Sequence, residues 1–145
     1  MLMNTHQIRI RGQLVEFEAA STAQGAHAVI RFASNQKMRA MGFPNLSAAN
    51  VSGPRPRNVY INSQNFYTPP RHWSNPNSYR EYVVAHEILH SMNANHLPSP
   101  GRGRPCPLMF AQTDPSKVHQ GGCDVSQRVS RADLRALEDT FDGWA

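Results

Sequence analysis

The sequence lacks any long apolar run and has few cysteines and few charged residues. No apolar segment of the 145 residues approaches the roughly 20 that a membrane-spanning helix requires, so we expect no membrane span. Residues 1–12 contain Arg9 and Arg11 but no apolar core of the kind that a secretory signal peptide has, so the compartment stays open. With 39% apolar and 17% charged residues, the composition is that of one globular domain, which we place over residues 1–145.

Acidic residues are fewer than basic ones, 10 against 15, which gives a formal net charge of +5. The basic residues cluster only at 55–57 and 102–104, in short segments rich in Pro and Gly and without interleaved aromatic residues. A surface that binds nucleic acid usually presents a broader basic patch, so we interpret both clusters as solvated loops and expect no nucleic-acid partner. An acidic substrate or an anionic surface remains compatible with this charge, because attraction would steer it towards the protein.

Cys106 and Cys123 are the only cysteines. In an oxidising compartment a disulfide between the two cysteines would close residues 106–123 into a loop and stabilise the fold by about 3 kcal/mol. In a reducing cytosol the two residues would be thiols. We favour the disulfide, because the segment is long and irregular and would otherwise be poorly held.

The most informative segment, residues 86–96, reads His-Glu-Ile-Leu-His-Ser-Met-Asn-Ala-Asn-His. On a helix, His86 and His90 lie one turn apart on the same face and can bind one metal ion. Glu87 then projects beside the metal, where it can act as a general base. His96 is too far along to share that face, so the helix must end near Asn93 and the chain must turn back. The spacing predicts one Zn²⁺ per chain, held by three histidines with an open fourth position.

The residues around the motif predict the helix that it needs. Ser78 to Glu81 reads as a capping box and places a helix over residues 79–92. Asn93 stands where a residue with positive φ would end it. Apolar residues recur at helical spacing and would face the core, namely Tyr82, Ala85, Leu89 and Met92.

The pattern H-E-x-x-H-x-x-N-x-x-H resembles the long motif of the metzincin clan of zinc peptidases, with Asn93 in place of the usual Gly. The segment from Cys106 to Met109 looks like the Met-turn of that clan, which implies that Met109 lies beneath the metal. The spacing is similar to that of small snapalysin-like secreted proteases, and residues 79–123 also look like a bacterial zincin-like domain of unknown function. The resemblance covers about a third of the chain.

The sequence departs from the clan at one position that matters for chemistry. Several metzincins carry a Tyr two residues after the Met, close to the metal or the oxyanion, and this chain has Ala111 there. Stabilisation of the oxyanion would then depend on the metal and on another donor. His119, Arg102 and Arg104 are candidates, although charged residues of loops are more often simply solvated.

The remaining pattern indicates an α+β fold. We expect a hairpin at residues 7–17, strands at 29–32 and 58–62, a short helix at 34–41, and a helix at 131–141 capped by Ser130 with Asp133. Residues 44–57, 68–77 and 97–127 are expected as loops. Strands first and helices later predict a twisted mixed sheet backed by an active-site helix and a C-terminal helix, as the metzincin resemblance also implies. Val59, Tyr60, Ile61 and Asn62 are predicted to form a sheet edge that pairs with the substrate.

Motif and resemblance together imply a zinc metallopeptidase, a monomeric hydrolase with a zincin-like catalytic domain acting on a protein or peptide substrate. Glu87 would take a proton from water as the water attacks the peptide carbonyl. The alternative is a zincin-fold metalloprotein with a structural, virion-associated or effector role. Glu87 argues against a purely structural site, since such a site needs no base and usually has four protein ligands.

Overall fold

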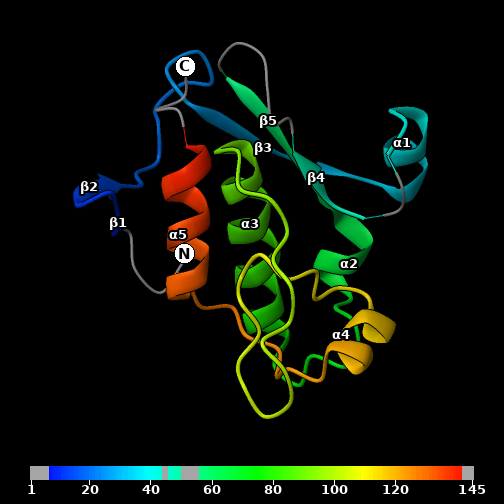
Figure 1. Ribbon diagram of the computed structural model, residues 1–145. Coiled ribbons are helices and arrows are strands. Elements are labelled where there is room, and N and C mark those ends of the chain that lie inside the picture. Colours follow the sequence, from blue (N-terminus) through cyan, green and yellow to red (C-terminus); the bar gives the residue numbers. More distant parts are fainter. Residues whose placement is uncertain (1–6, 44–45, 50–55, 142–145) are drawn as a thin grey trace.

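The computed structural model describes residues 7–43, 46–49 and 56–141, and it shows a mixed α+β arrangement (Figure 1). The predicted α+β class is therefore confirmed. In chain order the elements are β1 (Gln7–Ile10), β2 (Gln13–Glu16), β3 (Ala28–Ala33), α1 (Asn35–Ala40), β4 (Ala48–Ala49), β5 (Arg57–Asn62), α2 (Ser63–Tyr67), α3 (Pro76–Ser91), α4 (Pro115–Gly121) and α5 (Arg131–Thr140). None of the described helices is long and apolar enough to cross a membrane.

The described strands form a hairpin and a small mixed sheet. In the hairpin, β1 pairs antiparallel with β2 through a turn in which Arg11 and Gly12 both have positive φ, as a two-residue type I′ turn requires. In the three-stranded sheet the order is β3-β5-β4, with β5 parallel to β3 and antiparallel to β4. This confirms the predicted hairpin and the mixed character of the sheet.

The prediction that Val59, Tyr60, Ile61 and Asn62 form a sheet edge was wrong. These residues belong to β5, which lies between β3 and β4: all four pair with β3, and Val59 and Tyr60 pair with β4 as well. Val59 and Ile61 are fully buried, as suits a central strand. Among the described residues, the edge of the sheet next to α3 is β4, which lies within the predicted loop 44–57. Residues 44–45 and 50–55 of that loop lie outside the described residues.

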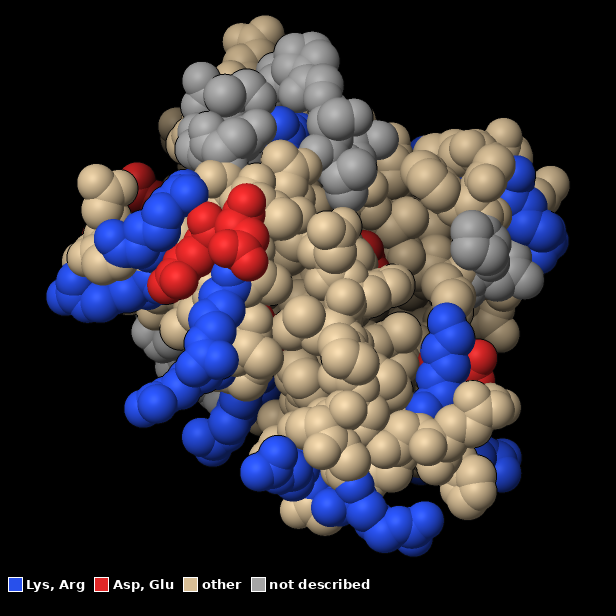
Figure 2. Space-filling model, in the orientation of Figure 1, with Lys and Arg blue, Asp and Glu red and all other residues tan. Residues whose placement is uncertain are grey.

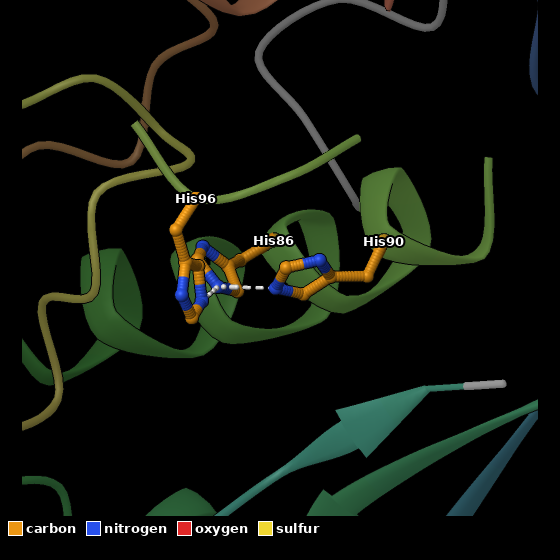
Figure 3. Close-up of side chains that lie close together, drawn as sticks. All are labelled: His86, His90 and His96. Carbon is orange, nitrogen blue, oxygen red and sulfur yellow. Dashed lines mark hydrogen bonds between the residues drawn. The ribbon is translucent and has the colours of Figure 1, made fainter. Parts of the chain in front are cut away.

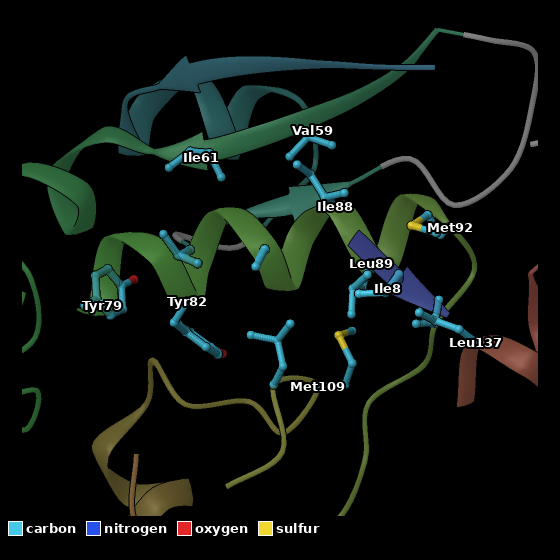
Figure 4. Packing of buried hydrophobic residues seen from close by; sticks show 14 of the residues in the cluster. Ile8, Val59, Ile61, Tyr79, Tyr82, Ile88, Leu89, Met92, Met109 and Leu137 are labelled. Atoms are coloured by element: carbon cyan, nitrogen blue, oxygen red, sulfur yellow. The ribbon is translucent and has the colours of Figure 1, made fainter. Parts of the chain in front are cut away.

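The long helix α3 forms the centre of the core. Figure 4 shows Val59 and Ile61 of β5 on one side of it, and Met109 and Leu137 on the other. The helix begins earlier than predicted, because Asn75 and not Ser78 is its cap: the Asn75 side chain accepts hydrogen bonds from the backbone N–H groups of Asn77 and Ser78. Pro76 follows as the first helical residue, where its missing N–H has no cost.

The segment after α3 is less irregular than predicted, because it contains the short helix α4. Asp114 caps this helix, Pro115 is its first residue, and Gly122 ends it in the left-handed conformation. Within this segment Cys106 and Cys123 form a disulfide. Next to it, the Cys106 N–H donates to the Asp124 carbonyl at 2.7 Å. The disulfide and this hydrogen bond thus connect the chain before α4 to the chain after it.

Candidate metal centre

The three predicted histidine ligands converge on one point (Figure 3). His86 and His90 project from α3, and His96 comes from the chain that turns back after the helix. The Nε2 atom of His86 lies 3.1 Å from that of His90 and 3.3 Å from that of His96. Zinc binds imidazole nitrogen at about 2.0–2.1 Å, so two ligands of a tetrahedral ion stand about 3.3–3.4 Å apart. Both distances are close to those between ligands of one tetrahedral cation, and all three ligand atoms lie within 4.8 Å of one another.

Two backbone carbonyls determine which nitrogens face this point. His86 Nδ1 donates to the Leu108 carbonyl at 2.6 Å, and His90 Nδ1 donates to the Ala94 carbonyl at 2.8 Å. A carbonyl oxygen can only accept, so in each neutral ring the proton is on Nδ1 and Nε2 carries a lone pair. Two lone pairs facing each other at 3.1 Å repel unless a cation lies between them. The hydrogen bonds thus orient both rings as metal ligands.

Burial favours the neutral form of the two helical imidazoles in the metal-free protein, and the more exposed His96 is shifted in the same direction. It lowers the pKa of His86 well below its usual value and that of His90 to about 4. The pKa of His96 is lowered first by burial and then by the charge of Lys117. A metal ligand must be unprotonated, so all three rings are ready to bind a cation near neutral pH.

Glu87 is the buried carboxyl of the site. Only 5% of its surface is exposed, and burial raises its pKa to about 8 in the metal-free protein. A divalent cation beside it would favour the carboxylate again. Glu87 also lines the same cleft as the three histidines, as a general base beside a metal must.

The end of α3 brings His96 back to the helix. Asn93 has a φ of 71°, which confirms the predicted left-handed residue, and the Ala94 N–H donates to the Leu89 carbonyl. Arg57, predicted in a solvated loop, is instead buried and donates to the Ser91 carbonyl at 2.6 Å. A cation at this end of a helix is favoured by the helix dipole. The sequence could not show this contact, because it joins residues 34 positions apart.

The segment 106–109 lies against both α3 and α5. Met109 is fully buried in the core cluster. Asp133 of α5, also fully buried, accepts hydrogen bonds from the backbone N–H groups of Leu108 at 2.9 Å and Met109 at 2.8 Å. The Leu108 carbonyl in turn accepts from His86. Asp133 was predicted only as part of a helix cap, and its support of this segment is a tertiary contact.

The histidines open into a cleft of about 300 Å³. Of the three donors predicted as candidates, His119, Arg102 and Arg104, none is among the residues that line it, and all three are exposed. The helix α4, which contributes to the cleft, was not predicted from the sequence, although Asp114-Pro115 is a recognisable helix start. The other cleft-lining residues are Leu46, Ser47, Ala48, Ala49, Tyr82, Ala111, Thr113, Asp114 and Lys117.

The burial of Met109 leads to a stability prediction. Met109→Ala should leave a cavity and lower the free energy of unfolding by about 2–5 kcal/mol. Met109→Leu conserves volume approximately and should cost under about 1.5 kcal/mol, with the metal retained. Urea unfolding of the two variants compares them directly. Equal stability of Met109→Ala and the parent would contradict a packing role for this residue.

Comparisons with protein-family models, with curated proteins and with solved structures found no match to this chain. The three histidines, the buried Glu87 and the cleft therefore carry the functional argument on their own geometry.

Proposed function

We propose that the protein is a zinc-dependent endopeptidase with a metzincin-like catalytic domain. The observation that carries the proposal is the convergence of three Nε2 atoms at the spacing of a tetrahedral ion, next to a buried carboxyl in an open cleft. Three histidines with one open position are typical of catalytic zinc, whereas structural zinc usually has four protein ligands.

The residues of the cleft divide the chemistry between them. Zinc, when bound, supplies a Lewis acid that activates water and polarises the peptide carbonyl. Glu87 accepts the proton of the attacking water and delivers it to the leaving amine. Leu108 and Ala94 hold the His86 and His90 rings through their carbonyls, which keeps the ligand geometry constant during turnover.

The substrate would lie along β4. Ala48 and Ala49 line the cleft and belong to the outer strand of the described sheet on that side. An extended peptide can add to such an edge through main-chain hydrogen bonds. In this proposal β4, and not residues 59–62, is the strand that pairs with the substrate backbone. The small side chains of Ala48, Ala49 and Ala111 leave room for a peptide beside the histidines.

Metal content and turnover test the proposal together. The parent should bind one zinc per chain and cleave casein or a fluorogenic peptide library, and a strong chelator should abolish cleavage until zinc is restored. His96→Ala removes one of three ligands and should lose most of the zinc. His119→Ala is the matched control, because this exposed histidine of α4 does not line the cleft.

Two results would count against the proposal. Full zinc occupancy in His96→Ala, measured by elemental analysis, would contradict the three-histidine site. Stoichiometric zinc without cleavage of any peptide would favour the alternative, a metalloprotein of this architecture with a structural, virion-associated or effector role.

A further inference from the structure

Lys117 is a cleft residue that the proposed mechanism does not use. It is the only Lys or Arg among the described residues that line the cleft. The chain has just two lysines, and the other, Lys37, belongs to α1 and does not line it. On the face drawn in Figure 2, most cationic side chains lie along the left and lower margins. Within the described part of the cleft, Lys117 is therefore the one basic side chain offered to a substrate.

The other polar side chains of the cleft are largely engaged within the protein. The Tyr82 hydroxyl accepts from the Gln112 N–H at 2.8 Å and donates to the Phe110 carbonyl at 3.3 Å. Thr113 Oγ1 lies 3.2 Å from the Tyr79 hydroxyl. Among the described residues no ion pair or hydrogen bond engages the Lys117 ammonium, so it is free to bind a substrate.

The helix α4, which carries Lys117, is held by packing at its end. Gly121, at the end of this helix, lies so close to its neighbours that an added Cβ would be 2.8 Å from Ser99 Cβ and 2.9 Å from Phe110 Cζ. Its carbonyl accepts from Ser99 Oγ at 2.6 Å, and Cys123 follows in the disulfide. The backbone of α4 is therefore held in place, and the exposed Lys117 side chain extends from it at the cleft.

Lys117 stands at the open side of the cleft that holds the histidines. It is exposed and lines the cleft together with His96. Its positive charge also contributes, after burial, to the lowered pKa of His96. A substrate that enters the cleft therefore meets this ammonium next to the histidines.

We propose that Lys117 is a specificity residue that binds a carboxylate of the substrate, either an acidic side chain near the scissile bond or the C-terminal carboxylate. The inference rests on the proposed peptidase function and names its substrate class as acidic peptides. The ammonium donates charge-assisted hydrogen bonds to the carboxylate, and a bound cation would add a second positive charge nearby. Asp114 also lines the cleft, but its Oδ1 accepts from the Ser116 N–H as the cap of α4.

Binding of zinc-chelating probes tests this without turnover. The probes are hydroxamate-capped dipeptide amides with Glu or Gln at either residue, and one Gln analogue with a free C-terminal carboxylate. Calorimetry on the zinc-loaded parent should show that one anionic probe binds about 10- to 100-fold more tightly than its neutral isostere, with the preference falling as salt is added. The position of the preferred carboxylate distinguishes a side chain from the C-terminus.

The variants decide whether Lys117 is responsible. In Lys117→Met, with zinc content verified, the ratio of the two affinities should fall to less than about threefold, whereas Lys117→Arg should keep most of it. Lys37→Met is the matched control and should keep the parental ratio. An unchanged ratio in Lys117→Met, or no anionic preference or no binding of any probe in the parent, overturns the inference. A preserved preference without peptide cleavage would instead contradict the peptidase function alone.

Discussion

Glu87→Gln is expected to lower kcat/KM for peptide cleavage by about 10²- to 10⁴-fold, the usual contribution of a general base. The amide keeps the shape of the side chain but cannot accept the proton of the attacking water. Zinc content should not change, because Glu87 is not one of the three converging ligands. Stability should change little, since burial raises the pKa of Glu87 to about 8, so at neutral pH a mostly uncharged group is replaced by another in the metal-free protein.

Glu81→Gln is the matched control for this experiment. Glu81 belongs to the same helix α3 but is half-buried and does not line the metal cleft. It should retain parental turnover. If Glu87→Gln cleaves as fast as the parent at equal zinc content, then a different base operates or the activity comes from a contaminant. Zinc analysis and kinetics on the same preparations separate these outcomes from a loss of metal.

Asp133→Ala is expected to lower the free energy of unfolding by about 2–6 kcal/mol, mainly because the buried N–H groups of Leu108 and Met109 lose their partner. The carboxylate accepts hydrogen bonds from the N–H groups of Leu108, Met109 and Ser130 and from the Ser130 hydroxyl. Removing it leaves buried donors without a partner, at about 1–3 kcal/mol each. Urea unfolding of the metal-free protein measures the loss.

The same substitution should also weaken zinc binding by about 10- to 100-fold, the usual effect of losing an outer partner of a metal ligand. The path runs through the peptide group between Leu108 and Met109, whose N–H donates to Asp133 and whose carbonyl accepts from His86. Asp139→Ala on the same helix is the control, because that residue is exposed and should change neither quantity. Parental zinc affinity in a folded Asp133→Ala protein would show that the segment 106–109 holds His86 without α5.

What the sequence alone predicts correctly in this protein depends on short-range geometry. The four-residue spacing of His86 and His90 puts them on one face wherever they are helical. Asn93 tolerates positive φ better than most residues and ends α3 as predicted. Ser130 and Asp133 cap α5 because both groups lie within one turn. The error at the start of α3 is also a matter of short-range geometry, since Asn75 and Ser78 are two possible caps three residues apart.

What only the tertiary structure decided depends on contacts between distant segments. The sequence of residues 58–62 is compatible with an edge strand and with a central strand. Only the pairing with β3 and β4 makes this strand central. The same holds for Arg57 at the end of α3, for Asp133 beneath Leu108, and for Lys117 at the cleft. Local spacing was thus enough to identify the histidines and the glutamate as candidate site residues. The orientation of the His86 and His90 rings, the burial of Glu87 and the nearby charge of Lys117 follow from the way distant parts of the chain pack around α3.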